Sequence, residues 1–180
     1  GWQGGVAPIT DEKIQGKLDW QINDNHRAVF SYINTKSGRV TDTSNSQTTN
    51  QAALSLMSKW YTLQSNLEIS KAQVLSRWSD NLSTELNYSH KDVINISSPF
   101  GGTDFAEMKI FVSPTTTSPA NPATGASAIW VGPDGARQAN GRTGKSDHFE
   151  FKGKYRLGAH TLSGGYEHER VYTFNIFVQG

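Results

Sequence analysis

The stretch that decides the fold is DHFEFKGKYRL, residues 147–157. In it Phe149 and Phe151 alternate with charged side chains such as Glu150 and Lys152. Successive side chains of a β-strand point to opposite faces, so this alternation predicts a strand with one apolar and one charged face.

The same period of two recurs in residues 14–32 and 82–89. Short segments rich in Asn, Asp and Gly interrupt or flank these runs, and such residues favour the tight backbone of a hairpin reversal. The sequence therefore predicts three hairpins with strands of about ten residues. They pair 13–22 with 27–34, 69–78 with 82–92, and 147–157 with 161–172, around reversals at 23–26, 79–81 and 158–160.

The connections between the hairpins are long: 35–54 and 93–146 are rich in Ser, Thr, Asn, Gly and Pro. Alternate connections of an antiparallel meander emerge at opposite ends of the sheet, so one end should carry tight turns and the other long loops. That asymmetry is typical of outer-membrane barrels. The predicted fold is all-β: an antiparallel up-and-down meander of about six to eight strands, forming part of a transmembrane β-barrel.

Three segments have a less definite prediction. Residues 53–69 carry Leu56, Trp60, Leu63 and Leu67 at a spacing that would also suit an amphipathic helix. Residues 105–112 and 128–131 are candidates for further strands.

In the barrel interpretation, each predicted strand has a side for lipid, a side for the lumen, and aromatic residues near the headgroups. The predicted lipid-facing residues are Leu18, Phe30, Leu82, Leu86, Phe149 and Phe151. The predicted lumen-facing residues are Lys17, Asp19, Glu85, Glu150, Lys152 and Lys154. The predicted interfacial aromatics, on the side of the short turns, are Trp20, Trp78 and Tyr155.

Composition limits the possible functions. The formal net charge of +1 disfavours a basic nucleic-acid binder, and the absence of cysteine removes thiolate nucleophiles and metal ligands. No Gly-x-Ser-x-Gly motif is present to position a nucleophile. We expect no catalytic residue, no metal and no cofactor, and therefore no enzyme. Hydrophobic residues make up only 35% of the chain, which suits a wall with one watery face.

Three segments also resemble the barrel of TonB-dependent outer-membrane receptors of the Oar-like branch. They are GKLDWQINDNHRAVFSYI from Gly16, SRWSDNLSTELNYSHKDV from Ser76, and the run from Gly132 to Gln179. The resemblance implies a barrel of about 22 strands, an N-terminal plug domain in its lumen and a motif that engages TonB. We expect the present chain, 1–180, to be a mid-barrel segment without the plug domain and the C-terminal part of the barrel.

The resulting hypothesis is a wall segment of a TonB-dependent transporter in the bacterial outer membrane, which takes up a scarce or large ligand. Its expected partners are outer-membrane lipid, its own plug domain, TonB and an unknown transported ligand. The candidate ligand-contacting loop residues are Trp130, Arg137, Gln138, Asn140 and Arg142. Two alternatives remain open: a soluble all-β binding module, with carbohydrate on exposed aromatics as one candidate ligand, and a complete small eight-stranded outer-membrane barrel.

Overall fold

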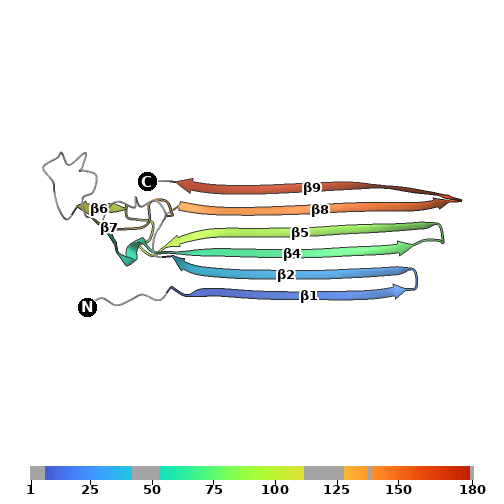
Figure 1. Cartoon of the computed structure of the whole chain (residues 1–180), viewed down its shortest axis with the longest axis horizontal. Helices are drawn as coiled ribbons and strands as arrows, with labels where there is room; N and C mark the ends of the chain where they lie inside the picture. Colours follow the sequence, from blue (N-terminus) through green and yellow to red (C-terminus); the bar gives the residue numbers. More distant parts are fainter. Residues whose placement is uncertain (1–6, 42–52, 112–127, 138, 179–180) are drawn as a thin grey trace.

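The computed structural model describes residues 7–41, 53–111, 128–137 and 139–178. Six long strands form one antiparallel sheet in the order β1-β2-β4-β5-β8-β9 (Figure 1). Their bounds are Ile9–Asn23 (β1), His26–Thr41 (β2), Tyr61–Arg77 (β4), Leu82–Pro99 (β5), Ala139–Leu157 (β8) and His160–Val178 (β9). The predicted all-β, up-and-down meander is thus confirmed.

The three short reversals lie at one end of the sheet, and the longer connections lie at the other (Figure 1). In the second reversal, the Ser79 hydroxyl accepts hydrogen bonds from the backbone N–H groups of Asn81 and Leu82 at 3.2 and 3.1 Å. In the third, Gly158 has φ of 61°, a left-handed conformation that glycine adopts without steric cost. All three reversals occur where the Asn-, Asp- and Gly-rich segments predicted them.

The strands are longer than predicted, with 15–19 residues each instead of about ten. The predicted bounds cover mainly the parts near the short reversals. The extra residues lie toward the long connections, where the simple alternation of apolar and charged residues ends. Pairing continues there nonetheless, for example between Asn66 and Ile94.

Residues 61–69 belong to β4, so the helical alternative is wrong for them. Upstream of them lie β3 (Ala53–Ser55) and a single 3₁₀ turn at Met57–Lys59. Leu63 and Leu67 are four residues apart, a spacing that places side chains on one side of a helix and also on one side of a strand. Pairing with β2 and β5 on both sides decides in favour of the strand.

The two further predicted strands exist as β6 (Met108–Phe111) and β7 (Ala128–Val131). They do not extend the meander: β7 pairs with β6 and with β3 in a second, three-stranded sheet. This sheet lies at the end with the long connections (Figure 1).

The six-stranded sheet is a single layer. Among the described residues, the buried apolar side chains are only Ala28, Tyr61, Ala128 and Pro133, and of these only Ala28 and Tyr61 lie in the six-stranded sheet. No helix in the described ranges is long and apolar enough to cross a membrane. Because the sheet is a single layer, most large apolar side chains of the meander are exposed. Their arrangement on the sheet is the main indication of function.

Candidate functional site

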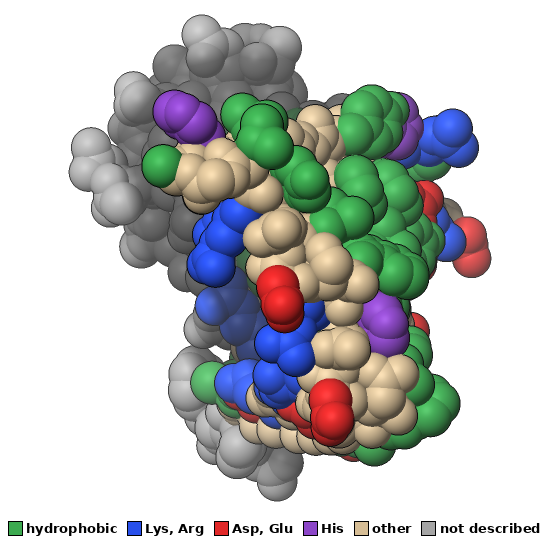
Figure 2. Space-filling model, turned by 90° about the vertical axis from the view of Figure 1, so that its right-hand side faces the viewer, with side chains coloured by type: hydrophobic (Ala, Val, Ile, Leu, Met, Phe, Trp, Pro, Cys, Tyr) green, Lys and Arg blue, Asp and Glu red, His purple; other side chains and the backbone are tan. Residues whose placement is uncertain are grey.

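The register of the sheet brings apolar side chains from all six strands onto one face, here called face A. One cross-strand row consists of Trp20, Ala28, Val74, Leu86, Phe151 and Tyr166. The next row on the same face consists of Leu18, Phe30, Ala72, Tyr88, Phe149 and His168. Figure 2, which looks onto the end with the short reversals, shows hydrophobic side chains gathered along one side of the molecule.

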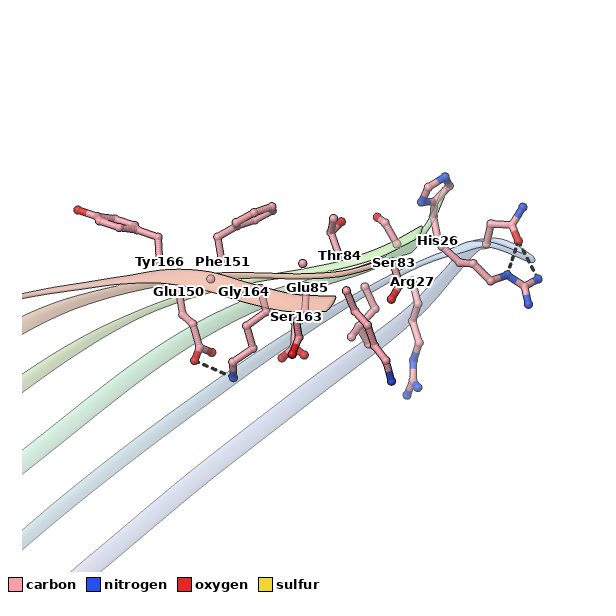
Figure 3. Close-up of a pocket in the computed structure, with 18 of the residues that line it drawn as sticks. His26, Arg27, Ser83, Thr84, Glu85, Glu150, Phe151, Ser163, Gly164 and Tyr166 are labelled. Carbon is pink, nitrogen blue, oxygen red and sulfur yellow. Dashed lines mark hydrogen bonds and ion pairs between the residues drawn. The ribbon is translucent and has the colours of Figure 1, made fainter. Parts of the chain in front are cut away.

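The intervening residues of the same strands form face B, which is polar near the short reversals. The row between the two apolar rows consists of Asp19, Val29, Gln73, Asn87, Glu150 and Glu167. Figure 3 shows the two faces at close range: Phe151 and Tyr166 project from one side of the sheet, and Glu150, Glu85 and Arg27 from the other.

The structure sorts the predicted residues by face. The six that the sequence assigned to lipid all lie on face A, and the six that it assigned to a lumen all lie on face B. Leu86, Phe149 and Phe151 keep 38%, 38% and 41% of their surface exposed, so no second layer of the described chain covers them. Contact with lipid itself stays a prediction.

The three predicted interfacial aromatics lie on face A close to the short reversals. Trp20 is three residues before the end of β1, Trp78 directly follows β4, and Tyr155 is two residues before the end of β8. The indole N–H of Trp78 donates to the Thr84 hydroxyl at 2.9 Å, and the ring lies edge-on to His26 at 5.0 Å. These contacts fix the Trp78 ring beside the second reversal.

A hydrogen-bonded network occupies face B near the short reversals. The side-chain amide of Asn87 donates to both Glu85 and Glu150, at 2.7 and 2.9 Å. Gln73 donates to Glu85 at 2.9 Å, and Lys152 pairs with Glu150 at 2.7 Å. Arg27, Glu85 and Lys152 are among the residues that line a hollow of about 830 Å³ (Figure 3). The network places fixed hydrogen-bond donors and acceptors along this hollow.

Face A contains a charge-free zone of nearly constant length on every strand. Measured from the short reversals, the first Asp, Glu, Lys or Arg on this face comes ten residues along β2, β5, β8 and β9, eleven along β1 and nine along β4. These first charged residues, here called the charged ring, are Glu12, Lys36, Glu68, Asp92, Asp147 and Arg170. Sequence reasoning missed the charged ring, although counting from the predicted turns would have found it.

One member of the charged ring is held by neighbours. The Asp147 carboxylate accepts a hydrogen bond from the Tyr88 hydroxyl at 2.9 Å and lies 2.7 Å from Nδ1 of His90. The hydrogen bonds from His90, and then from Tyr88, lower the pKa of Asp147 below its ordinary 3.8. The carboxylate is therefore stabilised in its charged form at this level of the sheet.

The short reversals are staggered across the sheet by a regular amount. The row that contains Ala28, Leu86 and Tyr166 lies two residues after the start of β2, four after the start of β5 and six after the start of β9. A stagger of two residues for every two strands, with a rise of about 3.3 Å and a strand spacing of about 4.8 Å, corresponds to a slope of about 35°. The charged ring is staggered in the same direction, since Asp147 pairs with Arg170, whereas Lys36 lies four residues farther from the reversals than Tyr32, the β2 residue in the Asp147 row.

Beyond the charged ring the polarity of β4 inverts. Here face A carries polar residues such as Asn66 and Gln64, while face B carries Leu63 and Leu67. The inversion begins just before the ring, where Ile69 of β4 faces Ile33 of β2 on face B. The apolar side of β4 therefore changes from face A to face B at the level of the charged ring.

The candidate ligand residues are not all in loops. Asn140 and Arg142 lie in β8 on face B, so their loop assignment is wrong, and Gln138 lies outside the described residues. The ring of Trp130, in β7, is contacted by the ammonium groups of Lys59 and Lys109 at 4.3 and 5.0 Å from its centre. The Trp130 ring therefore packs against these two lysine side chains at the small sheet.

A buried ion pair lies beside the small sheet, between the 3₁₀ turn and the residue before β6. Lys59 is 1% exposed and pairs with Glu107, whose second carboxylate oxygen accepts the backbone N–H of Gly135 at 3.1 Å. Arg137 lies over the Tyr61 ring at 5.9 Å. These contacts join the small sheet to the chain around it.

No protein-family model, no curated protein and no solved structure matches this sequence. Within the described ranges, no group of three or more His, Asp or Glu side chains is arranged to hold a metal ion.

Proposed function

We propose that this chain forms part of the wall of an outer-membrane β-barrel transporter of the TonB-dependent kind. The observation that carries the proposal is the charge-free zone on face A, which has nearly the same length on all six strands when it is measured from the short reversals. Ten residues along a strand inclined by about 35° span about 27 Å along the membrane normal, close to the apolar band of about 25 Å on such barrels.

The stagger of the reversals supports the same proposal. Strands of a closed barrel are inclined by about 35–45° to its axis, and a slope of about 35° would bring the three reversals to one level. The charged ring then comes to a second level, parallel to the first. Two parallel levels, one of turns and one of charges, are what the two surfaces of a bilayer require.

The polarity inversion on β4 has a direct physical explanation in a membrane. Inside the bilayer the apolar side of a strand turns outward to lipid, and above the bilayer it turns away from water toward the interior. A soluble sandwich would keep one apolar face along the whole strand, because the same second sheet covers it. The exposed Leu86, Phe149 and Phe151 also disfavour a soluble module, since soluble proteins rarely leave a large contiguous apolar patch uncovered.

The transporter part of the proposal draws on the resemblance and on face B. A wall that contacts a plug domain needs fixed polar groups around a water-accessible hollow, and the network around Asn87 provides them. The plug domain and the motif that binds TonB would belong to other parts of the protein. The outer edges of β1 and β9 would pair with neighbouring wall strands, because lipid does not tolerate unpaired backbone.

Site-directed spin labelling along β5 tests the membrane part. The chain has no cysteine, so residues 83–97 can each be replaced by a spin-labelled cysteine in the full-length protein in vesicles. Thr84, Leu86 and Tyr88 should be accessible to oxygen and not to a water-soluble nickel chelate, while Ser83 and Ser89 should show the reverse. From Asp92 onward the preference of even positions for oxygen should end.

Two results would contradict this proposal. Shielding of Leu86 and Tyr88 from both reagents would mean that protein covers face A. An oxygen preference that continues beyond Asp92 would mean that the membrane surface does not lie at the charged ring. The TonB part has a separate test: the full-length protein in detergent should bind the periplasmic domain of TonB in titration calorimetry. Absence of binding would remove energy coupling and leave the membrane wall intact.

A further inference from the structure

We infer that face B near the long connections binds an anionic ligand; this rests on the proposed function, which makes that surface the interior wall above the membrane. The surface begins at the row that contains Ile33, Ile69 and Lys91 and continues toward the long connections. It is here called the upper interior wall.

The charges of the upper interior wall have one sign from β2 to β9. They are Arg39 in β2, Lys91 in β5 and Arg142 in β8, and no carboxylate lies on this part of these strands. On β1 the two charged residues, Lys13 and Asp11, pair with each other at 2.7 Å. Face B nearer the short reversals differs, because Asp19, Glu85, Glu150, Glu167 and Glu169 stand among its cations.

The three cations are also free of charged partners. All three are exposed, and none of them makes an ion pair within the described ranges of the chain. From β2 to β9 the first carboxylate on face B is Glu169, which lies two residues closer to the short reversals than the Lys91 row and accepts a hydrogen bond from Ser146 at 2.7 Å. Asp11 on β1 lies closer to Arg39, opposite Ser37, but it is paired with Lys13. Unpaired cations in a concave wall attract anions more strongly than the same residues would on a flat surface, because the field is focused there.

The spacing of the cations sets the size of the ligand. Lys91 pairs with Ser146, so Arg142 lies one strand over and four residues along, a backbone separation of about 14 Å. Arg39 lies three strands and two residues from Arg142, a separation of about 16 Å, and two strands and six residues from Lys91, a separation of about 22 Å. A single small anion cannot reach all three, so a ligand that contacts all three carries several negative groups over about 14–22 Å.

Neutral groups between the cations indicate the rest of the ligand. Ser37, Ser65, Asn95 and Asn175 share a cross-strand row with Arg142 and offer uncharged donors and acceptors. The neighbouring Leu63 and Leu67 add apolar surface. A ligand that matches this wall has a partly apolar body with hydroxyl or amide groups and several acidic substituents.

Binding of defined polymers tests the inference in the full-length protein in detergent. The probes are short dextran sulfate and uncharged dextran of equal length at one fixed ionic strength. We expect dextran sulfate to bind and dextran not to. Arg39→Glu and Arg142→Glu should each weaken dextran sulfate binding by about tenfold, as expected for reversal of a solvent-accessible charge at the contact.

Lys36→Glu is the matched control, since it makes the same charge change on the same strand but on face A. It should change binding by less than about twofold. An equal loss in Lys36→Glu, an unchanged affinity in both arginine variants, or equal binding of the two dextrans would each overturn the inference. Spin-label accessibility along β5, recorded in Arg142→Glu, separates the two proposals: a retained alternation with unchanged dextran sulfate binding refutes only the anionic ligand.

Discussion

Replacing Phe151 by Arg is the sharpest test of the face assignment. Phe151 lies on face A six residues from the end of β8, near the middle of the ten-residue charge-free zone. An arginine near the bilayer midplane of a barrel costs about 2–4 kcal/mol, and the cost falls to about 0–1 kcal/mol near the interfaces. We expect Phe151→Arg to lower the folding equilibrium constant in vesicles by about 30- to 1000-fold, or to abolish assembly.

Two controls make the result specific. Leu82→Arg places the same side chain on face A at the first residue of β5, where the cost should be about 0–1 kcal/mol. Lys152→Ala changes the adjacent residue on face B and removes a partly exposed pair with Glu150, which should cost about 0–1 kcal/mol.

The assay is reversible urea unfolding of the full-length protein in vesicles, followed by tryptophan fluorescence and by heat-modifiable migration on gels. Because the cost of an arginine rises with its depth in the bilayer, Phe151→Arg should lower the free energy of unfolding far more than Leu82→Arg or Lys152→Ala does. Equal destabilisation by Phe151→Arg and Lys152→Ala would refute the face assignment. A larger effect of Leu82→Arg than of Phe151→Arg would refute the placement of the membrane.

Three further predictions concern packing and charge. A Cβ at Gly165 would lie 2.5 Å from a carbonyl oxygen of β8, so Gly165→Ala should destabilise the β8–β9 hairpin by about 1–3 kcal/mol in urea unfolding, whereas Gly164→Ala, with nothing within 4 Å, should not. Glu107→Gln leaves the buried Lys59 ammonium without its charge partner and should cost the small sheet about 3 kcal/mol, seen as faster amide hydrogen exchange there but not in β5; unchanged exchange would contradict a structural role for the pair. Because the pKa of Asp147 is lowered below 3.8, its charged form stabilises the fold above that pH, so the stability difference between wild type and Asp147→Asn should shrink as the pH falls below 3.8; a difference independent of pH would argue against it.

The strand lengths show where sequence reasoning stopped and why. Between Phe149 and Tyr155 one face is apolar and the other charged, so the period of two is easy to read. Beyond Asp147 both faces of β8 are polar or small, and the same strand continues without a pattern. Pairing with β5 and β9 holds it in place, and that information is not local to β8.

The candidate ligand residues illustrate a second limit. The neighbours of Asn140 and Arg142 are Gly and polar residues, which are common in loops, so the local sequence predicts a loop there. The register places Arg142 opposite Asn95 and Asn175 on face B, in a row with Ser65 and Ser37. The upper interior wall is therefore assembled from residues that no segment of the sequence contains together.

The sequence by itself determined which residues alternate, where the chain reverses, and which side chains share a face within each hairpin, because these properties depend on neighbours only a few residues apart. The tertiary structure decided the stagger of the hairpins, the matching stagger of the charged ring and the place along the sheet where the polarity of β4 inverts. Those features depend on the register between strands that are distant in the chain, and register follows from pairing across the whole sheet.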